Sequence, residues 1–82
     1  MSNSKTSQGK RIEQRRKSLD LTRVDLAGMA QISDKFLYDI ELGKKGMSAT
    51  TLDKLSQALG VSADWVLRGK KSAGGTRVGN GA

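Results

Sequence analysis

Apolar residues recur along the chain at the three- and four-residue spacing of short helices, and four of these patterns begin in the same way. Each opens with a hydroxyl residue that has an apolar residue directly before it and another four positions after it. Such a hydroxyl accepts a hydrogen bond from a free N–H of the first helical turn, and the apolar pair packs across it. The pattern predicts helices that begin at Thr22, Ser33, Ser48 and Ser62.

The apolar spacing and the glycines predict where these helices end. A further helix is expected before them, from about Lys10 to Ser18, because Ile12 and Leu19 lie seven residues apart on one face. The four later helices are expected to cover residues 22–29, 33–41, 48–59 and 62–69.

About three residues separate the second helix from the third, so the two must cross as a helix-turn-helix pair. The small Ala27 suits such a crossing. We therefore predict an all-α protein, a compact five-helix bundle over residues 10–69 with flexible termini. Residues 1–9 are polar and are expected to form a flexible arm, and residues 70–82 a disordered, Gly-rich basic tail.

One charged residue interrupts the apolar stripe of the first helix. Arg16 follows Ile12 by four positions, and a guanidinium on an inward face needs a partner. Glu41 follows Leu37 by four positions and lies on the inward stripe of the third helix. We predict a structural ion pair between Arg16 and Glu41; the alternative is that both are solvated at helix ends.

Composition restricts the function more than it defines it. The chain has 15 Lys and Arg against 8 Asp and Glu, a net charge of +7, which suits an anionic partner such as nucleic acid, an acidic substrate or a membrane surface. It has no Cys and no His, so no metal site or cofactor is expected and an enzyme is disfavoured. No apolar run is long enough for a membrane span or a signal peptide, so we expect a cytoplasmic protein.

The positive charge is concentrated at the ends of the chain. Between Leu19 and Gly69 there are six basic and seven acidic residues, a net charge of −1. The total charge is therefore no argument for the function of the helix pair, and the placement of individual cations matters instead.

The residues that carry a family resemblance run from Ile12 to Gly69. They read LT-x-x-x-LA, an apolar-Ser pair, apolar residues at 37 and 40, Glu41, a Gly-Lys loop, and L-x-x-L-x-x-ALGVS-x-D-x-x-L. This pattern resembles the lambda-repressor-like Cro/Xre family of helix-turn-helix DNA-binding proteins. The resemblance implies a five-helix bundle that binds operator DNA, usually as a dimer, to control transcription. It also implies the ion pair, because the matching arginine and glutamate are commonly paired in that family.

Two residues depart from the family pattern. Arg23 replaces the usual Gln, which touches a phosphate and buttresses a base contact; an arginine can keep the phosphate contact, but its buttressing role is in question. Gln31 replaces the usual Gly of the turn. A side chain on a left-handed residue costs about 1 kcal/mol, which the packing of the bundle can bear.

The third helix would place its outward side chains in the major groove. Lys35 can donate to guanine, Tyr38 to a base or phosphate, and Phe36 can pack on a thymine methyl or remain half-buried. An acidic side chain there either accepts from cytosine or holds a neighbouring Lys or Arg in place. The expected base-reading residues are Asp34, Lys35, Phe36, Tyr38 and Asp39.

Cations on both sides of this helix are expected to contact phosphates. Arg23 begins the second helix, and Lys44 and Lys45 lie in the loop after the third. With Arg11 of the first helix they give roughly three to five phosphate contacts per monomer, so binding should weaken steeply with salt. The alternative for the Lys-Lys loop is a solvated surface.

One reading helix covers only a few base pairs, so a homodimer is expected, at least on DNA. Trp65, Val66 and Leu67 cannot all face one core, which makes Trp65 or Leu67 a possible dimer contact; alternatively they cap the bundle. We predict a transcriptional regulator, a repressor that binds a palindromic double-stranded operator, with no small-molecule effector evident. The alternative function is an antitoxin-like protein-interaction module that uses the bundle as a scaffold.

Overall fold

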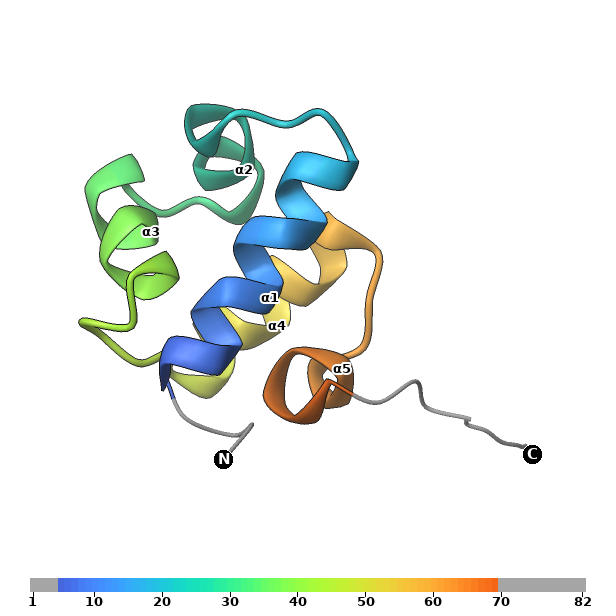
Figure 1. Cartoon of the computed structure of the whole chain (residues 1–82). Coiled ribbons are helices and arrows are strands. Elements are labelled where there is room, and N and C mark those ends of the chain that lie inside the picture. The colour runs from blue at the N-terminus through green and yellow to red at the C-terminus, as the bar shows by residue number, and fades with distance from the viewer. Residues whose placement is uncertain (1–4, 70–82) are drawn as a thin grey trace.

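The computed structural model describes residues 5–69, and all regular structure in this range is helical. The helices pack into one bundle (Figure 1). The expected all-α, five-helix fold is therefore confirmed. The predicted disordered tail lies outside the described residues. The helices are α1 (Lys5–Ser18), α2 (Arg23–Ala30), α3 (Asp34–Glu41), α4 (Ala49–Leu59) and α5 (Ala63–Arg68).

All four predicted helix starts are capped as the sequence indicated. The hydroxyls of Thr22, Ser33, Ser48 and Ser62 each accept a hydrogen bond from the backbone N–H three residues later. The Thr22 cap is reciprocal, because the Thr22 N–H donates to the carboxylate of Asp25. Gly60 and Gly69 end α4 and α5 in left-handed conformations.

The start of α1 was predicted wrongly. The helix begins at Lys5, so the expectation of a flexible arm through Gly9 is wrong for residues 5–9, while residues 1–4 lie outside the described part. Gly9 is a contact point rather than a linker residue. A Cβ atom on it would lie 2.2 Å from the Ile40 carbonyl oxygen, so only glycine lets α1 approach the end of α3 this closely.

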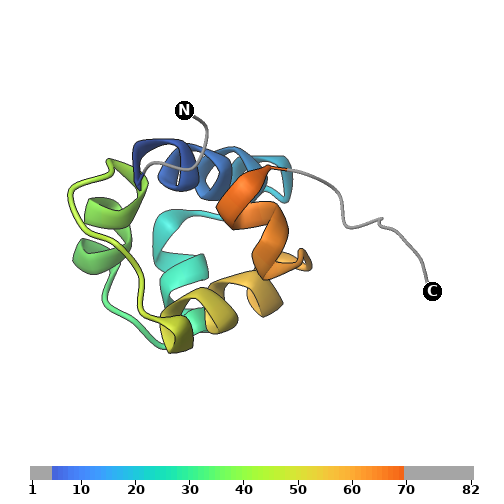
Figure 2. The same ribbon diagram turned by 90° about the horizontal axis from the view of Figure 1, so that it is seen from below.

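The core is formed by the inward faces of all five helices. The seven largest side chains in it are almost fully buried: Ile12, Leu26, Leu37, Ile40, Leu55, Leu59 and Val66. In both views α3 and α5 lie on opposite sides of the bundle (Figures 1 and 2). Among the described residues, no helix has the length and apolar character needed to cross a lipid bilayer.

Candidate nucleic-acid interface

The helix pair α2–α3 has the crossing that the sequence predicted. Ala27 is 3% exposed in the core, and its carbonyl accepts from Ile32 N–H across the turn. The turn residue Gln31 keeps the left-handed conformation, with φ 59° and ψ 42°, although it is not glycine. As a result α3 lies at the surface, between α2 and the loop that connects α3 to α4 (Figure 1).

The outward face of α3 carries three of the five expected reading residues. Asp34, Lys35 and Tyr38 are exposed, and Phe36 is half-buried against the core, as its boundary position indicated. Leu42 lies one turn after Tyr38 on the same face and is 48% exposed. It was missed because it follows the last helical residue, although its four-residue spacing from Tyr38 was visible in the sequence.

Asp39 was expected to face outward, and this expectation is wrong. Its side chain is buried, and its carboxylate accepts from Lys35 Nζ at 3.1 and 3.2 Å. Lys45 Nζ lies 3.8 Å from the same group. The hydrogen bond from Lys35 lowers the pKa of Asp39 despite burial, and the charges of Lys45 and Lys44 add to this effect. Asp39 thus holds lysines in place, the other role that the sequence left open for it.

The ion pair between Arg16 and Glu41 is present and buried. Arg16 Nε and Nη2 donate to the two carboxylate oxygens of Glu41 at 2.8 and 3.1 Å, and Nη1 donates to the Leu21 carbonyl at 3.0 Å. The hydrogen bond to Glu41, and after it the charge of that carboxylate, raises the pKa of Arg16 despite burial. A bidentate pair of this kind fixes the orientation of both planar groups, and so fixes α3 against α1.

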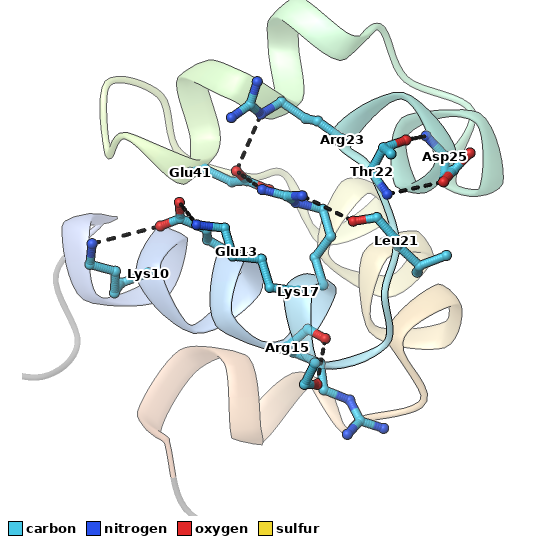
Figure 3. A network of polar contacts seen from close by, with 11 residues as sticks. Lys10, Glu13, Arg15, Lys17, Leu21, Thr22, Arg23, Asp25 and Glu41 are labelled. Atoms are coloured by element: carbon cyan, nitrogen blue, oxygen red, sulfur yellow. Dashed lines mark hydrogen bonds and ion pairs between the residues drawn. The ribbon is translucent and has the colours of Figure 1, made fainter.

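Arg23 shares the same carboxylate. Its Nε lies 3.3 Å from Glu41 Oε1, and its guanidinium carbon lies 4.9 Å from the centre of the Tyr38 ring. The two terminal amino groups point away from Glu41 (Figure 3). Arg23 is therefore held in place through one nitrogen, while its outer donors remain directed to the surface beside α3.

The loop cations flank α3 on its other side. The backbone N–H groups of Lys44 and Lys45 both donate to the Asp39 carbonyl, at 2.9 and 3.3 Å, which ties the loop to the end of α3. Lys45 Nζ lies 5.8 Å from the Phe36 ring centre. The structure thus brings three of the four expected phosphate ligands to α3: Arg23, Lys44 and Lys45.

Arg11 does not lie with these three cations, and its expected phosphate contact stays a prediction. Its Nη1 donates to the Val66 carbonyl at 2.6 Å, at the C-terminal end of α5. Arg15 acts in the same way on α4, through the Leu59 carbonyl at 3.0 Å. Both guanidiniums satisfy carbonyls that a helix end leaves unpaired.

The two candidate dimer residues of α5 differ in their surroundings. Val66 is fully buried, and Trp65 is half-buried and packs against the core, so Trp65 closes the bundle. Leu67 is half-buried and is not among the residues that pack on the core. Of the two, Leu67 remains the candidate for a contact between monomers.

Comparisons with known proteins agree with this geometry. The immunity repressor protein of Bacillus phage phi105 is 37% identical over 59 residues, which cover 72% of this chain and 41% of the relative. The chain thus spans less than half the length of that protein. The P22 c2 repressor, solved in complex with a synthetic operator, is 32% identical with a TM-score of 0.75, covering 77% of this chain and 96% of that one.

A second solved structure is also similar. The N-terminal DNA-binding domain of SinR from Bacillus subtilis is 33% identical with a TM-score of 0.70, covering 73% of this chain and 88% of that one. The family model for a helix-turn-helix domain matches residues 9–72. The capped α2–α3 pair, the buried ion pair and these matches agree: the chain belongs to the helix-turn-helix domain family, in its lambda-repressor-like form.

Proposed function

We propose that this chain is a cytoplasmic transcriptional repressor that binds double-stranded DNA with α3 in the major groove. One observation carries the proposal: Arg23 lies against Tyr38 and Glu41 of α3, while Lys44 and Lys45 lie against the helix at Asp39. Phosphate contacts on both sides fix a helix in the groove, and side chains on its outer face then reach the base edges. The relatives that are repressors support this choice.

In this proposal the protein binds its operator as a homodimer, with one monomer on each half of a two-fold symmetric site. A single helix of this length reads too few base pairs to be specific, and half-sites one helical turn apart double the reading surface. Leu67 on α5 is the proposed dimer contact. Since α5 lies on the opposite side of the bundle from α3, pairing through it would leave the reading face open (Figure 2).

Selection from a pool of random duplexes tests this function. We expect an enriched sequence with two-fold symmetry, bound more weakly as salt rises. On that duplex, Lys44→Ala should reduce the slope of log affinity against log salt by about 1 per monomer. Lys54→Ala removes the same charge from α4, away from the proposed dimer helix, and should leave the slope unchanged. A pool without enrichment would overturn the proposal and favour the protein-interaction module.

A further inference from the structure

The cation on the α2 side of α3 is held by two side chains of α3. Glu41 accepts from Arg23 Nε, and the face of the Tyr38 ring lies against the guanidinium at 4.9 Å. Tyr38 and Glu41 are three positions apart, so they are neighbours on the helix surface. A guanidinium that rests on a ring and bonds to a carboxylate has few remaining conformations, and it loses little freedom when a phosphate binds it.

The cation on the loop side is held in the same way. The Asp39 carboxylate lies 3.8 Å from Lys45 Nζ, and the Phe36 ring centre lies 5.8 Å from the same atom. Phe36 and Asp39 are again three positions apart. On α3 an aromatic residue is therefore twice followed, three positions later, by a carboxylate. The two pairs are displaced by two residues, and each holds one of the flanking cations.

Both carboxylates are buried beside a surface that is proposed to meet phosphates. Asp39 and Glu41 are 4% and 6% exposed. Each carboxylate joins two cations: Glu41 bonds to Arg16 and Arg23, while Asp39 bonds to Lys35 and lies near Lys45. A buried carboxylate is costly without such partners. The cations shield the carboxylates, and the carboxylates fix where the cations stand.

We propose that the two aromatic residues of α3 and the two acidic residues of its second half are positioning residues, and that base reading rests on the first turn of the helix, at Asp34 and Lys35. The positioning residues hold Arg23 on one side of α3 and Lys45 on the other; they are Phe36, Tyr38, Asp39 and Glu41. Tyr38 acts through its ring face and not through its hydroxyl. This inference rests on the proposed function, because it assigns roles within the same DNA-binding surface.

Tyr38 provides the sharpest test, because it is 40% exposed and can be replaced without opening the core. On the selected duplex, Tyr38→Phe should keep the native affinity, since the ring face remains. Tyr38→Leu should weaken binding roughly threefold to tenfold, since the platform under Arg23 is lost. In an Arg23→Ala background, Tyr38→Leu should cost nothing further, because the residue acts only through the arginine.

Two outcomes would overturn the role of Tyr38 while leaving the proposed function intact. If Tyr38→Phe binds as weakly as Tyr38→Leu, the hydroxyl itself contacts DNA. If the losses from Tyr38→Leu and Arg23→Ala add, Tyr38 contacts DNA independently. A measurement without DNA gives a separate check: the Arg23 δ-methylene protons should show an upfield ring-current shift in the native protein and in Tyr38→Phe. A shift absent from the native protein would also overturn the inference.

Asp39 allows a second test, which compares the affinity for the selected duplex with the affinity for a scrambled duplex. If Asp39 were only a negative charge near DNA, Asp39→Asn would strengthen binding to the selected duplex and to a scrambled duplex equally. If Asp39 is a positioning residue, its carboxylate is needed mainly for binding to the selected duplex. Asp39→Asn should then lower the ratio of specific to non-specific affinity severalfold. Asp53→Asn on α4 removes the same charge from an exposed position and should leave the ratio unchanged. An unchanged ratio for Asp39→Asn would overturn its positioning role.

Discussion

At the scale of single residues, the turn between α2 and α3 carries a local strain that substitution can relieve. Gln31 adopts a left-handed conformation, which costs a residue with a Cβ atom roughly 1 kcal/mol relative to glycine. We expect Gln31→Gly to raise the free energy of unfolding by up to about 1 kcal/mol, less the entropy that glycine gains in the unfolded chain. Urea denaturation measures this change.

The matched control for the turn is Gln31→Ala, which keeps the Cβ atom and should give no such gain. Gln31 is exposed, so neither variant removes a packed side chain. A loss of stability in Gln31→Gly would mean that the unfolded-state entropy of glycine exceeds the strain in the folded turn. In that case the glycine typical of the family would serve some purpose other than stability.

Residue roles on α3 were only partly predictable, and Asp39 shows why. A helical wheel places Asp39 between the outward position of Tyr38 and the inward position of Ile40, so its exposure depends on its neighbours. The loop after α3 returns over this position through the hydrogen bonds of Lys44 and Lys45 to the Asp39 carbonyl. Helical periodicity contains no information about that loop, so the burial of Asp39 could not be predicted from the periodicity.

At the scale of helices, two glycines in helical positions should respond to alanine in opposite directions. Gly28 lies exposed in α2, and a Cβ atom there would meet nothing within 4 Å. Gly28→Ala should therefore stabilise the protein by about 0.5–1 kcal/mol, through better helix propensity. Gly9→Ala should instead destabilise it by roughly 1–3 kcal/mol, because the methyl group forces α1 away from the α3 carbonyls.

Each of these variants serves as the control for the other, since both make the same change within a helix. Chemical denaturation of the two proteins gives the comparison directly. Equal stabilisation by both would show that α1 and α3 are farther apart in solution at Gly9. Equal destabilisation would instead show that a methyl group at Gly28 meets a steric obstacle in solution.

The helix starts were predictable because capping is local chemistry, and its whole pattern lies within six consecutive residues. All four hydroxyl caps were found from the sequence. The start of α1 was not found, because residues 5–9 contain no apolar residue and Gly9 has the character of a linker. That turn of helix exists through its contact with the end of α3, and such a contact is not recorded in local sequence.

At the scale of the whole molecule, arginines of α1 connect distant parts of the chain. Arg11 and Arg15 bond to the carbonyl ends of α5 and α4, and Arg16 bonds to Glu41 on α3. Glu41 also accepts from Arg23 on α2. The sequence predicted only one of these links, because Arg16 lies on an apolar stripe, whereas Arg11 and Arg15 lie on faces that usually belong to the solvated surface.

Acid should weaken the whole molecule through carboxylates that are hydrogen-bonded in the folded state. Three of them have a pKa below the ordinary value: Lys17 bonds to Glu13, the Thr22 N–H to Asp25, and Lys35 to Asp39. In the unfolded chain these carboxyl groups have their ordinary pKa of about 4, whereas in the folded chain they lose their protons at lower pH. Just below about pH 4 the unfolded chain therefore binds more protons than the folded chain. This difference makes stability fall as the pH falls.

The stabilisation from these carboxylates should be complete above their unfolded pKa values and should disappear as the pH falls through the lower, folded values. Since the chain has no His, no side chain of ordinary pKa titrates between about pH 5 and 8. The urea midpoint should therefore be constant from about pH 8 to 5 and decline from about pH 4 to 2. Asp25→Asn, which removes one of the three groups, should start from a lower midpoint and decline less. A midpoint that rises on acidification would show that these carboxylates are easier to protonate in the folded protein than in the unfolded chain.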